Sequence, residues 1–319
     1  MTTAPAESKI ASTITAKQRP GDRVFSTATV VSGSLILATL AAVAIFLVVQ
    51  SLPAFTAEPG EFKGDATNFW QYVGPLVFGT IWAAALALIM AVPVAIGIAL
   101  FISHFAPRKL AQGLGYVVDL LAAVPSVVFG LWGISVLAPA VQPFYSQLTE
   151  WFSWFPLFAG PVSGTGRTIL TVAVVLAVMV LPIITAISRE VFLQTPVLHE
   201  EAALALGATR WEMIKLAVLP FGRPGIVSAS MLGLGRALGE TMVVAMVLSP
   251  APGLITFALL QSQNSNTIAA NIALNFPEAH DVGVNILIAT GLILFVITLA
   301  VNMLARYIVD RRKEFSGAN

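Results

Sequence analysis

Long apolar runs alternate with short polar segments along most of this 319-residue chain. Six runs reach the roughly 20 residues that an α-helix needs to cross a bilayer. They lie at about 24–50, 76–102, 115–138, 167–188, 224–249 and 284–308. Because a backbone segment in lipid must satisfy its own hydrogen bonds, we expect all six to be helices. The pattern predicts an all-α polytopic membrane protein with six transmembrane helices.

The third apolar run is the least uniform. Asp119, Pro125 and Ser126 interrupt it with a charge, a helix breaker and a hydroxyl. Polar and flexible residues in a span are typical of packing inside a helical bundle rather than exposure to lipid. We expect Asp119 to lie near the cytoplasmic end in a structural role, and a role in a pathway is the alternative for all three residues.

The polar stretch 201–220, between the fourth and fifth runs, has the pattern of a helical hairpin. Gly207 can adopt a positive φ and end a first helix. Thr209 and Glu212 fit a capping box that opens a second helix. Pro220 is expected to end that helix, because proline has no N–H and clashes with the preceding turn. A hairpin of this kind in a membrane protein is typical of a docking surface for a partner.

Composition agrees with a membrane chain and argues against an enzyme. Apolar residues make up 57% and charged residues only 10%, against about 25% charged in soluble domains. The chain has no cysteine, and its three histidines fall in three different loops. A Walker pattern, a nucleophile elbow and metal-binding histidine spacing are all missing from the sequence. We expect no catalytic residue, metal or cofactor in this chain. If the system uses ATP, another polypeptide hydrolyses it.

Positive charge is concentrated in one set of segments that lie outside the apolar runs or at their ends. These are the N-terminal tail, the loops 103–114 and 189–223, and the C-terminal tail. They hold Lys9, Lys17, Arg19, Arg23, Arg108, Lys109, Arg189, Arg210, Lys215, Arg223, Arg306, Arg311, Arg312 and Lys313. The opposite loops hold only Lys63 and Arg167. The positive-inside rule therefore places both termini and the hairpin in the cytoplasm.

The first run is about twice the 7–15 apolar residues of a signal peptide, so we expect it to stay as the first span. The chain then forms one transmembrane domain over 21–314, with a disordered tail at 1–20 and a short tail at 315–319. Of the outer loops, 140–166 is rich in aromatic residues, which fits interfacial anchoring or a docking surface. The segment 261–279 is expected to contain a short polar helix at the outer surface.

Two ionisable residues lie deep in the fifth run. Arg236 is about 12 residues from the cytoplasmic end, or roughly 18 Å into a core of about 30 Å. Glu240 follows at i+4, on the same helical face. A charge at that depth faces a bundle interior or a water-filled cavity, and arginine suits an oxyanion. Arg236 either faces an anion pathway with Glu240 balancing it, or forms a buried ion pair that fixes helix packing.

The hairpin resembles the EAA loop of bacterial ABC importer permeases. It matches that pattern at Glu201, Ala202, Ala203, Gly207, Leu219 and Pro220, and it has Ala217 where the pattern has isoleucine. In that family the loop forms a coupling helix that sits in a groove of the ATPase subunit. The resemblance implies ATPase coupling by the motif residues and by the neighbouring Thr209, Arg210 and Glu212.

A wider resemblance, to the C subunits of phosphate-specific ABC transporter permeases, covers about residues 20–314. It rests on the segments 51–55, 120–130, 235–241 and 267–272. It implies the type I ABC importer permease fold in a bacterial plasma membrane. The implied partners are a second, A-subunit-like permease, two cytoplasmic ATPase subunits that use ATP and Mg, an extracytoplasmic phosphate-binding protein and the lipid bilayer, with no nucleic acid.

Other functions are also compatible with the residues. The chain could be a permease for another oxyanion, such as sulfate, molybdate or phosphonate. It could also be a membrane sensor or scaffold that signals anion status without transport. An ion-coupled secondary transporter is disfavoured, because it does not need an EAA-type hairpin and the sequence shows no convincing inverted repeat.

Overall fold

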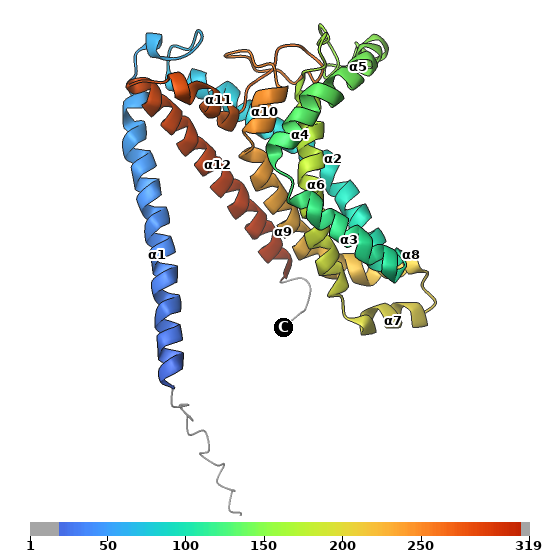
Figure 1. The fold of residues 1–319 in the computed structure, drawn as a ribbon. Coiled ribbons are helices and arrows are strands. Elements are labelled where there is room, and N and C mark those ends of the chain that lie inside the picture. The colour runs from blue at the N-terminus through green and yellow to red at the C-terminus, as the bar shows by residue number, and fades with distance from the viewer. Residues whose placement is uncertain (1–18, 314–319) are drawn as a thin grey trace, which may run out of the picture. The chain divides into compact units, whose positions relative to one another are not determined.

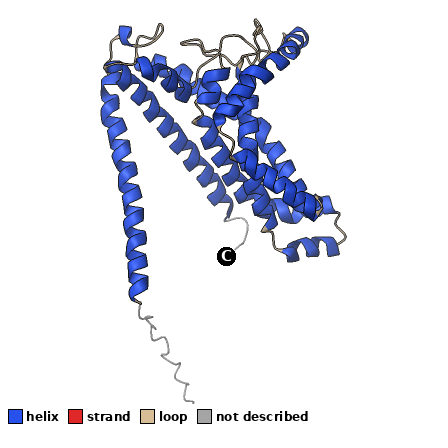
Figure 2. Ribbon diagram, viewed as in Figure 1, coloured by secondary structure: helices blue, strands red, loops and turns tan. Residues whose placement is uncertain are grey.

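The computed structural model describes residues 19–313, with side chains up to Tyr307. Most of the expected N-terminal tail and the whole C-terminal tail, residues 1–18 and 314–319, lie outside the described residues. Within the described part, the regular structure is helical and contains no strand (Figure 2). Two isolated bridges, Val162 with Gln261 and Pro250 with Asn264, join outer loops. The expected all-α class is confirmed.

Six helical segments are long and apolar enough to cross a membrane, which confirms the predicted number of spans. They are Pro20–Phe55, Phe69–Phe105, Ser126–Phe152, Ile169–Leu193, Arg210–Leu238 and Val282–Tyr307. Their elements are α1 (Pro20–Ser51), η1 (Leu52–Phe55), α2 (Phe69–Leu100), η3 (Phe101–Phe105), α4 (Ser126–Trp132), η4 (Gly133–Leu137), α5 (Ala138–Phe152), α6 (Ile169–Leu193), α8 (Arg210–Met213), η5 (Ile214–Val218), α9 (Leu219–Leu238) and α12 (Val282–Lys313). The connecting elements are η2 (Pro59–Glu61), α3 (Arg108–Ala122), α7 (Val197–Ala205), α10 (Met242–Val247), α11 (Ile268–Asn275) and η6 (Phe276–Glu278).

The chain divides into two compact units, residues 1–49 and 50–319. In the first, the described structure is most of α1, which exposes large apolar side chains such as Val24, Leu35 and Phe46 around its circumference. A helix that is apolar on all sides suits a lipid environment. The second unit holds the other elements and the hydrophobic core.

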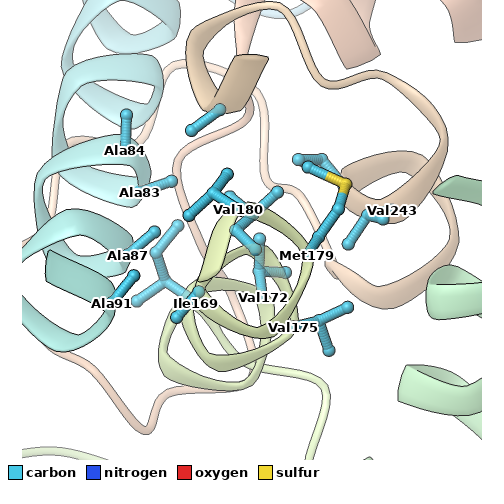
Figure 3. Close-up of a cluster of buried hydrophobic side chains, with 14 of the residues drawn as sticks. Ala83, Ala84, Ala87, Ala91, Ile169, Val172, Val175, Met179, Val180 and Val243 are labelled. Carbon is cyan, nitrogen blue, oxygen red and sulfur yellow. The ribbon is translucent and has the colours of Figure 1, made fainter. Parts of the chain in front are cut away.

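The core of the second unit is centred on α6, which packs against α2 and α9 (Figure 1). On α2, an alanine stripe that includes Ala83, Ala87 and Ala91 faces the branched side chains of α6, among them Val172 and Val180 (Figure 3). Small residues let two helix backbones approach closely, which favours association where lipid supplies little hydrophobic driving force. The helix α6 is therefore the central helix in the core of the second unit.

The predicted third span, 115–138, is wrong in its boundaries. Residues 108–122 form a separate amphipathic helix, α3, and the span begins only at Ser126 and runs to Phe152. The break falls at residues 123–125, because Pro125 has no N–H and disfavours helical backbone at the residue before it. Asp119 lies exposed on α3 and is therefore outside the span.

The predicted fifth span, 224–249, is also displaced. One continuous helical segment runs from Arg210 to Leu238, so Pro220 does not end the second helix of the hairpin. The π turn η5 closes with Leu219 N–H donating to Ile214 O. Pro220 follows directly in the first turn of α9, so the π turn accommodates the proline and the helical segment continues. At the far end the helix stops at Leu238, and α10 begins at Met242.

The segments expected on the outer side are more ordered and more buried than their composition predicts. Residues 140–152 belong to α5 rather than to a loop. The expected helix in 261–279 is present as α11, but Ile268, Ala270 and Asn271 are buried on one of its faces. Asn271 Nδ2 donates to Tyr72 OH on α2 at 2.8 Å. This helix is therefore packed against α2 rather than lying on the surface.

Candidate functional site

The turn of the hairpin has the geometry that its sequence predicts. Gly207 has φ +87°, and its N–H donates to Leu204 O at 2.9 Å while Ala208 N–H donates to Ala203 O at 3.2 Å. These two bonds form a Schellman motif that closes α7. Thr209 Oγ1 then accepts from Glu212 N–H at 3.3 Å, and Glu212 Oε2 accepts from Thr209 N–H at 2.8 Å. The predicted C-cap and capping box are both confirmed.

The hairpin presents an exposed surface at one end of the second unit. Figure 1 shows α7 and α8 at the opposite end from α10 and α11. Glu201, Ala202 and Arg210 are exposed, and Leu206 keeps 90% of its surface. Ala203 is half-buried against a cluster that contains Phe192 and Met213. The hairpin is thus anchored on one side and open on the other.

A contact that the sequence did not predict ties α7 to the end of the second span. His104 Nε2 in η3 lies 3.4 Å from Glu200 Oε1 in α7, and the other ring nitrogen of His104 is 2.7 Å from Ser103 Oγ. The two residues are 96 positions apart, so no local pattern reports their contact. The hairpin is connected to α2 as well as to α9.

Arg236 lies in the last turn of α9 and lines a cavity of 910 Å³ between α6, α9 and α12. The side chain is half-buried, and its Nε is buried without a hydrogen-bond partner among the described residues. The cavity is also lined by Ser228 and Gly235 of α9 and by Asn302 and Arg306 of α12. Arg236 thus lines a cavity between helices, and it forms no ion pair with a described side chain.

Glu240 does not lie on the same helical face as Arg236. The helix ends at Leu238, so the predicted i+4 relation on one face is broken. Glu240 is 7% exposed, and its Oε1 accepts from Val243 N–H at 3.2 Å at the start of α10. The part of the chain that the structure describes contains no ion pair between Arg236 and Glu240. The prediction of a buried pair is therefore wrong, because the break at Gly239 re-aims the carboxylate.

The far end of α10 is held by Arg167, a residue used above only to orient the chain. Its Nε donates to Val247 O at 3.3 Å, and its Nη2 donates to Met246 O at 3.2 Å and to Leu248 O at 3.0 Å. The last carbonyls of a helix have no partner within the helix, and a cation there is favourable. Glu240 and Arg167 thus secure the two ends of this short helix.

The remaining candidates stay apart from the cavity. Asp119 is exposed on α3, and Pro125 and Ser126 mark the start of α4. No group of three or more histidine or carboxylate side chains that could hold a metal occurs among residues with described placement. The structure therefore brings together Arg236 with polar residues of α12, which the sequence had not singled out.

Comparison with known proteins agrees with this architecture. The family model of the binding-protein-dependent transport system inner membrane component matches residues 91–314. The phosphate transport system permease protein PstC 2 of Mycobacterium tuberculosis is 46% identical over 300 residues, covering 91% of this chain and 92% of that protein. The corresponding PstC protein of Mesorhizobium japonicum is 39% identical over 308 residues, covering 93% and 92%.

Solved structures share the fold at low identity. A chain of a bacterial alginate ABC transporter, crystallised with an alginate-bound periplasmic protein, has a TM-score of 0.59 at 17% identity and covers 91% of this chain and 95% of its own length. A chain of the methionine transporter MetNI in an inward-facing conformation has a TM-score of 0.52 at 17% identity, covering 75% and 93%. The chain belongs to the family of binding-protein-dependent transport system inner membrane components.

Proposed function

We propose that this chain is a permease subunit of an ATP-driven importer and that, with a second permease, it forms the pathway that moves inorganic phosphate into the cytoplasm. The observation that supports phosphate as the substrate is the position of Arg236, which lines a cavity between membrane-spanning helices and forms no ion pair with a described side chain. Relatives that are 46% and 39% identical over most of the chain carry the name of phosphate transport permeases. The family and the cavity point to the same class of substrate.

Arg236 addresses the main obstacle to moving an anion across a membrane. A charge transferred into a low-dielectric interior without a partner loses far more free energy than it can recover there. A guanidinium offers several N–H donors in a fixed fork and makes charge-assisted hydrogen bonds to an oxyanion. An arginine that is not already paired makes these bonds without first breaking an internal one. Phosphate in transit is stabilised by Arg236 for this reason.

The hairpin is the proposed docking element for the ATPase subunits, which use ATP and Mg while this chain hydrolyses nothing. The concentration of Lys and Arg around the hairpin and both termini supports a cytoplasmic position for all of them. The segment from Arg210 to Leu238 is continuous helix, so it joins the hairpin to Arg236. Displacement of α7 and α8 when the ATPase dimer closes is transmitted along this helix to the pathway.

The direct test is ATP-dependent uptake of labelled phosphate by the complete importer in vesicles, with its phosphate-binding protein outside. We expect uptake that needs ATP and that excess sulfate, molybdate or phosphonate does not suppress. Suppression by one of these anions would assign the permease to that anion. Binding-protein-dependent ATP hydrolysis without any uptake would favour a sensor subunit.

A matched pair of glycine variants tests the hairpin. Gly207 and Gly253 both have positive φ, at +87° and +70°, and both have open space around the position of a Cβ. Substitution to valine strains either site to a similar degree. We expect Gly207→Val to reduce co-purification of the ATPase subunits and ATP hydrolysis coupled to uptake, and Gly253→Val to leave both unchanged. Equal behaviour of the two variants would argue against docking at the hairpin.

A further inference from the structure

We propose that Arg306 and Asn302 of α12 complete the Arg236 cavity as a binding site for inorganic phosphate, so that the anion is held between α9 and α12 by two arginines rather than one. This inference rests on the proposed function and adds the residues that hold the substrate. Neither residue belongs to a motif noted in the sequence. Both line the same 910 Å³ cavity as Arg236.

The placement of polar residues on α12 supports a site rather than a simple surface charge. Asn302 and Arg306 are spaced i and i+4, so they share one face of the helix, and both line the cavity. Asn302 and Arg306 are themselves exposed, as are the apolar residues Met303 and Leu304 between them, which do not line the cavity. A charge needed only to anchor the helix end would work on any face. Here the polar residues lie on the side that faces α9.

The charge of the cavity matches a phosphate group. Among the side chains of described placement, which end at Tyr307, its lining contains Arg236 and Arg306 and no carboxylate. Those same side chains make no ion pair with either arginine. Inorganic phosphate carries between about one and two negative charges near neutral pH, so a single arginine leaves part of that charge uncompensated. Two arginines compensate it.

Ser228 gives the site a means to prefer phosphate over sulfate. Its Oγ donates to Pro224 O at 2.9 Å. Because its only proton is used in that bond, the hydroxyl faces the cavity as an acceptor. Monohydrogen phosphate has a proton to donate to such an acceptor, whereas sulfate has none. The Asn302 amide supplies both a donor and an acceptor to the same anion.

The backbone leaves room for the anion beside Arg236. A Cβ added at Gly235 would meet no atom within 4 Å, so the glycine opens directly onto the cavity. Leu232 lines the same space and keeps 57% of its surface. Since the chain has no cysteine, one cysteine placed at Leu232 reports on access to the cavity without a background from this chain.

The experiment uses the complete importer in nanodiscs with Leu232→Cys in this chain. The rate at which a cationic thiol reagent modifies that cysteine is measured with and without inorganic phosphate. We expect phosphate to slow modification about tenfold and sulfate to slow it much less. Arg306→Gln should weaken the phosphate protection by about 10- to 100-fold in concentration, the strength of a charge-assisted hydrogen bond. Ser228→Ala should narrow the difference between phosphate and sulfate.

The matched control is Arg108→Gln, which removes the same charge from α3 away from the cavity and should keep full protection. Absence of phosphate protection, or protection that survives Arg306→Gln, would overturn the proposal. Labelling that ignores inorganic phosphate but slows as the nanodiscs gain anionic lipid would assign the site to a lipid headgroup instead. Loss of ATP-driven uptake in the unsubstituted importer would contradict the proposed function itself, while normal uptake in Arg306→Gln contradicts only this site.

Discussion

Arg167 and Arg236 are both half-buried arginines, yet their surroundings differ completely. Arg167 donates to three backbone carbonyls at the end of α10. Arg236 lies one helix earlier, and its buried Nε has no hydrogen-bond partner among the described residues. The guanidinium of Arg167 is occupied by hydrogen bonds within the fold, whereas the buried Nε of Arg236 is not. The two arginines therefore differ in whether nearby backbone carbonyls engage the guanidinium.

The largest effect is expected for Arg236→Gln. Loss of the cation should lower phosphate uptake by about 100-fold, the equivalent of about 2.7 kcal/mol. The thermal stability of the complex should change little, because no bond within the fold is lost. Arg236→Lys should recover part of the uptake, since it restores the charge without the fork. Uptake and thermal unfolding of the purified importer are measured together; a large drop in unfolding temperature would make Arg236 structural.

The opposite outcome is expected for Arg167→Gln. Glutamine can keep at most part of the three carbonyl contacts, so the outer end of α10 should lose about 2 kcal/mol. Thermal unfolding should occur at lower temperature, and hydrogen exchange should rise in α10. Residual uptake per folded complex should stay much closer to normal than in Arg236→Gln. An unchanged unfolding temperature would show that Arg167 does not stabilise the fold, which would contradict the contrast with Arg236.

Arg189→Gln tests whether a buried nitrogen without a partner is enough to predict function when the residue does not line the cavity. Like Arg236, Arg189 has a buried Nε without a partner among residues of described placement. Its guanidinium instead occupies the space beside Gly115 of α3, where an added Cβ would lie 2.0 Å from Nη1. We expect a stability loss of about 1 kcal/mol from lost packing, and uptake reduced less than about threefold. A loss as large as that of Arg236→Gln would show that an unpartnered nitrogen alone predicts function.

The smallest effect is expected for Lys63→Gln. Lys63 Nζ pairs with Glu278 Oε2 at 3.3 Å, and the two side chains keep 57% and 75% of their surface. Exposed pairs contribute about 0–1 kcal/mol. The unfolding temperature of the importer should therefore change by an amount close to the error of the measurement. A destabilisation comparable to Arg167→Gln would mean that outer charges matter for the fold generally, whether or not they hold a helix end.

Local features of the fold could be predicted because they depend on few neighbouring residues. Gly207, Thr209 and Glu212 make their bonds within six positions, and the predicted turn is confirmed. The helix boundaries at Pro125 and Pro220 were harder. Pro125 follows a break in the helix and directly precedes α4, whereas Pro220 is accommodated by the π turn before it. Both residues carry the same local signal, so packing around them decides the outcome.

Only part of the site could be predicted from the sequence, because the rest depends on contacts between distant residues. The depth of Arg236 in an apolar run identifies it, since a charge there is costly unless it faces a cavity. Glu240 was predicted beside it only because the helix was assumed to continue. Arg306 and Asn302 come from a helix that follows more than 60 positions later, and no periodicity within either helix reports that the two line one cavity.

The sequence by itself determined the number of spans, the all-α class and the cap chemistry of the hairpin, because hydropathy and capping are properties of short segments. The tertiary structure decided where α9 stops, which carbonyls Arg167 occupies and which polar face of α12 meets Arg236. These depend on contacts between residues far apart in the chain, where packing and unmet hydrogen bonds outweigh local preference.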